Sequence, residues 1–264
     1  MPTLRIPGPN GPLVASVHGR LEAERPKELF LFVEGWGPGL VRPMSPSDAS
    51  ARWLARRAGV LTATVFLTGI GSPGKVDGLS RGDFLREVLT GYDRLVERPG
   101  VAGISAVGTS FGGYLVTLLT AKRPVERLVL KVPTDVEPDG FDTRPQADFA
   151  GELGLPWKSA RHAPSESQAL TAAAHYRGPV WLISAGRDEF VPWQTTQNYL
   201  NALSPTRTTH PNHPPACTRG PSRHARPRRH LPQGARRSRG DSGRLSLLAE
   251  WAPGRAVPFG GRVS

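Results

Sequence analysis

Short apolar runs alternate along the first 204 residues with segments of mixed polarity. A strand buried on both faces is apolar at nearly every position, and the run LFLFV at 29–33 has this form. Such runs, rich in aliphatic and β-branched residues, predict strands at residues 13–17, 29–33, 61–67, 104–107, 128–132 and 180–184. No similar run follows residue 202, so the sequence predicts no further strand there.

Two segments between these runs have apolar residues three and four positions apart, which is the spacing of an amphipathic helix. They predict helices at residues 47–57 and 83–97, and a third helix at 111–120 follows directly from a predicted strand. Strands that alternate with helices are typical of the α/β class, here a mostly parallel sheet flanked by helices. Residues 133–178 are less periodic and predict a small cap within a domain that spans residues 1–204.

The composition changes sharply near residue 205. Residues 1–204 hold 22 Lys and Arg against 20 Asp and Glu, whereas residues 205–244 hold ten Arg and a single acid, Asp241. Leu231 is the only large aliphatic residue in residues 205–244, which contain no aromatic residue. Ordering a residue costs about 1–2 kcal/mol in backbone entropy, which so little apolar surface cannot offset. The sequence therefore predicts a disordered Arg/Pro-rich tail at 205–244, followed by a short terminal helix and tail at 245–264.

This abrupt change has two interpretations. Translation of a GC-rich gene in the wrong reading frame would replace an expected strand and helix with such a tail, and the nucleotide sequence tests that hypothesis. Alternatively, the tail is a genuine basic arm in a chain of net charge +12 and binds polyanions nonspecifically through phosphate contacts. Residues 205–244 have no aromatic side chains for base stacking, so no specific nucleic-acid partner is expected.

Several protein classes are excluded by simple counts. A single cysteine, Cys217, rules out a disulfide framework and a cysteine-based zinc site. No run of about 18 apolar residues is long enough to span a membrane, and the start MPTLRIPGPNGP has no apolar leader segment. We expect a cytoplasmic protein with no membrane partner, no metal and no cofactor.

The segment ISAVGTSFGG at 104–113 carries the most informative motif, Gly-x-Ser-x-Gly, with Ser110 at its centre. An apolar strand precedes the motif and a helix follows it, and in this context the motif forms a sharp turn that exposes the serine hydroxyl. Gly108 and Gly112 would let the strand and the helix approach closely. The motif predicts Ser110 as a nucleophile, which then needs a base, a group that orients the base, and donors for the oxyanion.

The remaining parts of such a site are found at the ends of other predicted strands. The backbone N–H of Phe111 and that of Trp36, in the glycine-rich loop at 34–39, are the candidate oxyanion donors. Asp188 follows the strand at 180–184 through a glycine turn and is the best candidate for the orienting acid. The adjacent Glu189 is expected to point elsewhere, and the weaker candidates, which follow the preceding strand, are Asp135, Asp139 and Asp142.

The segments VEGWGPG, VGTSFGG and ISAGRDEFVP resemble the oxyanion loop, the nucleophile elbow and the acid turn of the α/β-hydrolase superfamily. The resemblance covers roughly residues 13–204 and points to the small dienelactone-hydrolase and carboxylesterase-like serine hydrolases. It implies a catalytic histidine about 25–35 residues after the acid, beyond one further strand. One departure is Glu34, which stands where such enzymes often carry a histidine.

The histidine that the resemblance implies falls in the basic tail. His213 lies 25 residues after Asp188 and is the candidate base. The other histidines in the tail are His210, His224 and His230. The histidines that precede the expected position, interpreted as surface or packing residues, are His18, His162 and His175.

Together these observations predict a serine hydrolase that cleaves a small carboxylic ester through an acyl-enzyme intermediate. In this prediction Ser110 attacks the acyl carbon, His213 carries the proton and Asp188 orients the histidine. The alternative is a catalytically impaired α/β-hydrolase relative whose basic tail binds polyanions nonspecifically. The sequence names neither the acyl nor the alcohol part of the substrate, and it leaves the oligomeric state open.

Overall fold

The structure is a computed structural model that describes residues 3–36, 45–72, 78–149, 151–186, 188–203 and 208–209. All of these residues belong to one compact unit, Met1–Asn212. Its strands are β1 (Thr3–Gly8), β2 (Gly11–His18), β3 (Lys27–Val33), β4 (Leu61–Thr68), β5 (Gly71–Ser72), β6 (Val101–Thr109), β7 (Leu128–Lys131), β8 (Val180–Ile183) and β9 (Thr208–Thr209). The α-helices and 3₁₀-helices are α1 (Pro46–Ala58), α2 (Arg81–Val96), α3 (Phe111–Thr120), η1 (Gln146–Phe149), η2 (Gly151–Gly154), α4 (Leu155–Ser159), η3 (Pro164–Glu166), α5 (Gln168–His175) and α6 (Trp193–Ala202).

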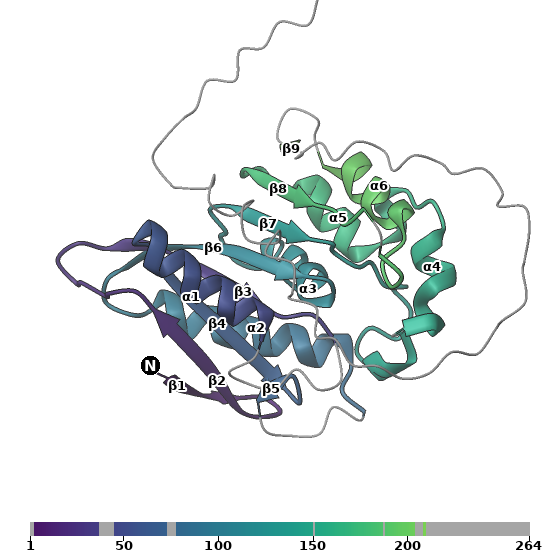
Figure 1. The fold of residues 1–264 in the computed structure, drawn as a ribbon. Coiled ribbons are helices and arrows are strands. Elements are labelled where there is room, and N and C mark those ends of the chain that lie inside the picture. Colours follow the sequence, from purple (N-terminus) through teal and green to yellow (C-terminus); the bar gives the residue numbers. More distant parts are fainter. Residues whose placement is uncertain are drawn as a thin grey trace, which may run out of the picture. The chain divides into compact units, whose positions relative to one another are not determined.

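The strands form one twisted sheet (Figure 1). Neighbouring strands lie in the order β1-β2-β4-β3-β6-β7-β8-β9, and β5 pairs with β4 beside this path. β2 is antiparallel to β1 and to β4, whereas the pairs from β4 across to β9 are parallel. The carboxyl ends of β3, β6, β7 and β8 therefore meet at one edge of the sheet, where the loops that follow these strands lie close together.

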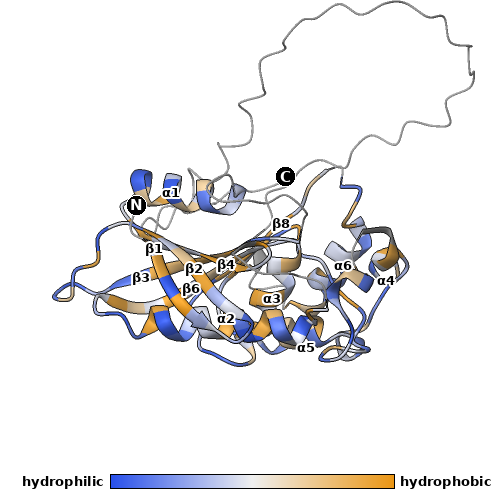
Figure 2. Cartoon of the chain, turned by 90° about the horizontal axis from the view of Figure 1, so that it is seen from below, coloured by the Kyte–Doolittle hydropathy of each residue, from blue (hydrophilic) through white to orange (hydrophobic). Residues whose placement is uncertain are grey.

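Helices cover both faces of the sheet. Helix α1 lies on one face, while α2, α3 and α5 lie on the other (Figure 2). Within β3, Leu29, Leu31 and Val33 belong to the core cluster that also contains residues of α2 and α3. The alternate residues Phe30 and Phe32 are buried as well. This arrangement explains why the run at 29–33 has no polar position.

Local sequence signals set the ends of the helices. Ser45 caps α1 by accepting a hydrogen bond from the backbone N–H of Asp48, and α1 ends at Gly59, whose φ of 65° is left-handed. Helix α2 begins with a reciprocal capping box between Ser80 and Asp83. Helix α3 differs, because Ser110 stands at its N-cap without a side-chain capping bond.

The structure confirms the α/β class, the predicted strands and the three predicted helices, with ends that differ by a few residues at most. It adds β1, whose proline and glycine residues hide the strand pattern, and the helices α5 and α6. The prediction of no strand after residue 202 is wrong, because Thr208 and Thr209 pair in parallel with β8. Backbone hydrogen bonds make this pairing, so it needs no apolar run. The rest of the predicted tail at 205–244 and the predicted helix at 245–264 lie outside the described residues.

The segment between β7 and β8, predicted as a small cap, contains η1, η2, α4, η3 and the crossover helix α5. No helix among the described residues is long and apolar enough to cross a membrane. In the same part of the chain, no group of three or more His, Cys, Asp and Glu side chains is placed to hold a metal ion.

Candidate active site

Ser110 occupies a strained turn between β6 and α3. Its φ of 51° and ψ of −117° are sparsely populated for a residue with a side chain, and such strain is stored where surrounding structure fixes the backbone. The backbone N–H of Ser110 donates to the carbonyl of Lys131 at 2.9 Å. Its carbonyl accepts from the N–H of Thr134 at 3.1 Å and from that of Tyr114 at 3.2 Å. Three main-chain bonds therefore hold the turn, two of them to residues 131–134 at the end of β7 and one to α3. The Ser110 hydroxyl is left uncommitted to capping α3.

The glycines of the motif stand where no side chain fits. A Cβ atom at Gly108 would lie 2.4 Å from the carbonyl oxygen of Gly112, and a Cβ atom at Gly112 would lie 2.3 Å from the carbonyl oxygen of Val33. Both distances are well inside van der Waals contact, and both partners are backbone atoms. Any larger residue at either position would have to push β3, β6 and α3 apart.

The loop after β3 rests directly on the elbow. A Cβ atom at Gly35 would lie 3.1 Å from the Cβ atom of Ser110 and 3.1 Å from the carbonyl oxygen of Thr109. The next residue, Trp36, packs its ring edge-to-face against Phe111, with ring centroids 6.1 Å apart. The two residues predicted to supply the oxyanion donors, Trp36 and Phe111, therefore lie next to each other and next to Ser110.

A cavity of about 270 Å³ opens at this point. It is lined by Ser110, Trp36, Phe111 and Asp188, which come from three separate segments of the sequence. The remaining walls are mostly apolar, and a small apolar cavity with a few polar groups is the usual form of a small-molecule site. The predicted nucleophile, donors and acid thus share one cavity at the carboxyl edge of the sheet.

Asp188 is held by the turn that follows β8. One carboxylate oxygen, Oδ1, accepts from the backbone N–H of Phe190 at 2.9 Å and from that of Val191 at 2.8 Å. The side chain is half-buried. Because both of these bonds go to Oδ1, the second oxygen has capacity for a further donor, as an acid that orients a histidine requires.

The weaker candidates for the orienting acid form hydrogen bonds or ion pairs away from the cavity. Asp135 is buried and accepts from the Ser167 hydroxyl at 2.6 Å and from the Trp157 indole at 3.1 Å. Burial raises the pKa of Asp135, and these two hydrogen bonds oppose that rise. Asp139 and Asp142 are exposed and form ion pairs with arginines. Glu189 is exposed as well. Of the four candidate acids, Asp188 is the one that lines the cavity.

The described histidines do not supply the base. His18 pairs with Asp48, with Nε2 and Oδ1 2.9 Å apart. His162 stacks on Trp157 with ring centroids 3.8 Å apart, and His175 is exposed on α5. The predicted base, His213, lies outside the described residues, as do the tail histidines His210, His224 and His230.

Sequence reasoning missed three features of the cavity. Lys158 of α4 lines it and donates to the carbonyl of Phe190 at 3.2 Å. Burial lowers the pKa of Lys158, and the negative charge of Asp188 opposes this effect. Gln146 also lines the cavity, and Val132 has a φ of 44° that is uncommon for a β-branched residue. Lys158 and Gln146 come from a segment with no clear periodicity, so no pattern in the sequence singles them out.

The strand order, the elbow and the acid turn define the α/β-hydrolase fold, which this chain has. No protein-family model matches the sequence, and no curated protein sequence matches it either. Among solved structures, it is similar to Est1E from Butyrivibrio proteoclasticus with ferulic acid bound, with a TM-score of 0.60 and 15% identity over 80% of this chain and 89% of the other. A Pyrobaculum calidifontis esterase gives a TM-score of 0.54 and 17% identity over 81% and 75% of the two chains. The acylaminoacyl peptidase of Pyrococcus horikoshii gives a TM-score of 0.58 and 16% identity, over 76% of this chain and 34% of the other.

Proposed function

We propose that this protein is a serine hydrolase that cleaves a small carboxylic ester through an acyl-enzyme intermediate. The observation that carries the proposal is the position of Ser110, in a strained turn at the start of a helix and in one cavity with Asp188, Trp36 and Phe111. The solved structures of similar fold include esterases, which agrees with ester chemistry at this site. A cavity of about 270 Å³ favours a small acyl group.

In the proposed reaction the Ser110 hydroxyl attacks the acyl carbon and passes its proton to a histidine. The backbone N–H groups of Phe111 and Trp36 stabilise the negative oxygen of the tetrahedral intermediate. The alkoxy C–O bond then breaks, and the alcohol leaves with the proton from the histidine. Water repeats the sequence on the acyl-enzyme, which releases the acid and restores the Ser110 hydroxyl.

We propose His213 as the base. It lies 25 residues after Asp188, and the short strand β9 precedes it and pairs in parallel with β8. This is the position, beyond one further strand, that the family resemblance implies for the histidine.

The test is ester turnover by the purified 264-residue chain, together with labelling by a fluorophosphonate. Ser110→Ala should abolish both while leaving the circular dichroism spectrum unchanged, because losing a triad nucleophile costs on the order of 10⁶ in rate. Ser50→Ala, at a serine on α1 whose hydroxyl bonds the carbonyl of Pro46, is the matched control and should keep both. Hydrolysis of p-nitrophenyl acetate at the wild-type rate by Ser110→Ala would overturn the proposal.

The charge of the tail favours a second candidate function, in which the chain is a poor enzyme and residues 205–244 bind polyanions. Ten arginines in that stretch support it. Binding to DNA should then weaken steeply with salt, since counterions are released on binding. A chain that ends at residue 204 should not bind, and unchanged binding by that chain would exclude the tail as the cause. The cytoplasm stays the proposed location for either function.

A further inference from the structure

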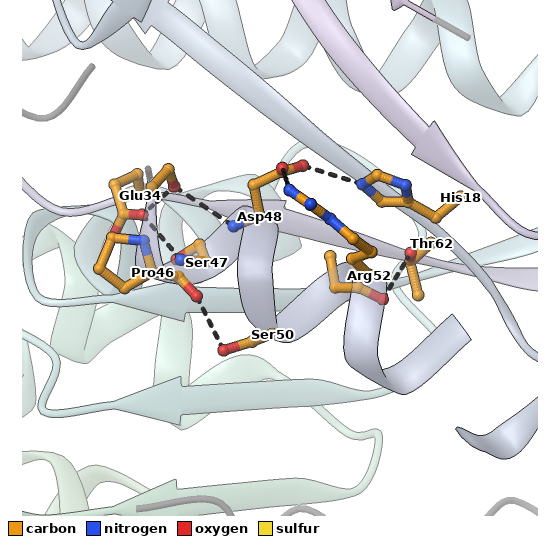
Figure 3. Close-up of polar contacts among 10 residues, drawn as sticks. His18, Glu34, Pro46, Ser47, Asp48, Ser50, Arg52 and Thr62 are labelled. Atoms are coloured by element: carbon orange, nitrogen blue, oxygen red, sulfur yellow. Dashed lines mark hydrogen bonds and ion pairs between the residues drawn. The ribbon is translucent and has the colours of Figure 1, made fainter. Parts of the chain in front are cut away.

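The Glu34 carboxylate lies in the first position after β3 and is only 4% exposed. One of its oxygens, Oε2, accepts from the backbone N–H of Ser47 at 2.9 Å and from the hydroxyl of Ser45. The second oxygen, Oε1, accepts from the backbone N–H of Gly35 at 3.2 Å. One carboxylate therefore connects the oxyanion loop to the beginning of α1 (Figure 3).

A buried carboxylate is costly unless hydrogen bonds and positive charge compensate it. Here the compensation comes from α1, because Ser45 is the N-cap residue of that helix and Ser47 lies in its first turn. The N-terminus of a helix carries a partial positive charge that stabilises an anion close to it. The Glu34 carboxylate is thus held at the N-terminal end of α1.

The helix end that holds Glu34 is itself fixed to the sheet. Asp48, in the first turn of α1, is 1% exposed and pairs through Oδ1 with Nε2 of His18 on β2 at 2.9 Å. Its second oxygen accepts from Arg52 at 2.9 Å. Figure 3 shows Asp48 between Glu34 and His18, with Arg52 on the same helix as Asp48. The N-terminal end of α1, to which Glu34 bonds, therefore has little freedom to move with the loop.

The loop that Glu34 holds is the one in contact with the nucleophile. The carbonyl oxygen of Glu34 lies 2.5 Å from the place a Cβ atom on Gly112 would take. Gly35 faces the Cβ atom of Ser110, and Trp36 follows directly and packs against Phe84 with ring centroids 5.5 Å apart. A bond from Glu34 to the N–H of Gly35 thus acts on the peptide group immediately before the proposed donor.

We propose that Glu34 is a positioning residue for the oxyanion hole, which it serves by locking the peptide groups of Gly35 and Trp36 in the orientation that aims the Trp36 N–H at the developing oxyanion. This role rests on the proposed hydrolase function. Glu34 does not touch the substrate.

Glu34→Gln is the informative variant because it keeps the shape and changes the bonding. The amide has one acceptor oxygen for three donors, and its NH₂ group must face at least one of them. If the amide oxygen keeps the two donors of Ser45 and Ser47, the NH₂ group repels the N–H of Gly35. The fold is then retained and the loop is released from its brace.

The experiment measures kcat and KM for p-nitrophenyl acetate in the wild type, Glu34→Gln and the control Ser50→Ala, which alters α1 without touching Glu34. Losing an oxyanion donor lowers kcat about 10²–10³-fold, so a displaced donor should lower it about 10–100-fold with KM changed by less than about threefold. A smaller active fraction also lowers the apparent kcat at constant KM, so kcat is expressed per active site, counted by fluorophosphonate titration. A purely structural role would lower the melting temperature and the number of active sites but leave kcat per active site unchanged. Amide hydrogen exchange should also become faster in the peptide that contains residues 33–36, and stay unchanged at 104–109.

The outcomes separate the two proposals. An active wild type with a Glu34→Gln variant of equal kcat would overturn the positioning role and leave the hydrolase function standing. A wild type with neither turnover nor fluorophosphonate labelling would overturn the hydrolase function, and the positioning role with it. If Glu34→Gln does not fold, Ser45→Ala removes one of the three donors and should lower kcat about 3–10-fold. An unchanged kcat in that variant, confirmed folded, would refute the role.

Discussion

A single methyl group added at Gly35 tests how closely the oxyanion loop must sit on the elbow. In Gly35→Ala the new Cβ atom would lie 3.1 Å from the Cβ atom of Ser110 and 3.1 Å from the carbonyl oxygen of Thr109. Carbon atoms pack best at about 3.5–4.0 Å, so the loop and the elbow must separate by roughly half an ångström. The elbow is held by three main-chain bonds at Ser110, and we expect the loop to make most of this movement.

A shift of this size is small for the fold and large for the reaction. Overpacking by one methyl group typically costs about 1–3 kcal/mol, which lowers the melting temperature of a domain of this size by about 2–4 °C per kcal/mol. A misplacement of about 1 Å in a catalytic site can cost about 100-fold in rate. Half that distance predicts a fall in kcat of about tenfold.

The control is Ser50→Ala, at a serine on α1 whose hydroxyl donates to the carbonyl of Pro46. Both variants are compared with the wild type by kcat for p-nitrophenyl acetate and by thermal unfolding. Ser50→Ala should keep the wild-type kcat. A Gly35→Ala variant that loses stability yet keeps the wild-type kcat would show that the loop takes no part in the reaction.

The other predictions concern the base, the buried tyrosines and one strained residue. His213→Ala should abolish ester turnover while His210→Ala keeps it, and the reverse result in steady-state kinetics would assign the base to His210. Burial raises the pKa of all four tyrosines, to about 12 for Tyr176. Because the unfolded phenols titrate near pH 10, the stability from these raised pKa values is complete below pH 10 and is lost as the pH rises toward 12. Phenolate absorbance at 295 nm should therefore rise at a higher pH in the folded protein than in the unfolded chain, and a phenol that titrates near pH 10 in the folded protein would contradict this. Val132→Asn should raise the free energy of unfolding by about 0.5–1 kcal/mol in urea titrations, since Asn tolerates the φ of 44° better, and a loss of stability would refute the strain.

The parts of the fold that could be predicted are those whose signal lies within one segment. The run at 29–33 is apolar throughout because both faces of β3 are covered, and the motif at 104–113 fixes a strand, a turn and a helix together. Strand β1 escaped prediction because the residues of its hairpin, IPGPNGP, have the composition of a turn. β9 escaped because two threonines pair through the backbone alone.

In the site, too, the residues that could be predicted are those with a signal within one segment. A predicted strand and a glycine turn precede both Ser110 and Asp188. The sequence therefore predicts that the two side chains lie close together at one edge of the sheet. Glu34 stands out in the sequence only as a departure from the family pattern. Its role depends on Ser45 and Ser47, which lie more than ten residues later and meet it only when α1 packs on the sheet. Hydrogen bonds between residues so far apart in the sequence leave no signal in the local pattern of apolar and polar residues.

The neighbouring strands β3 and β6 send the chain in opposite directions. After β3 the chain crosses to α1 on one face of the sheet, and after β6 it enters α3 on the other (Figure 2). Where adjacent strands diverge in this way, a crevice forms at the carboxyl edge of the sheet. The cavity lined by Trp36 and Ser110 lies at this point. The place of the crevice is a property of strand order rather than of any side chain, so changes in the segment 133–178 can alter what enters it without moving the proposed site.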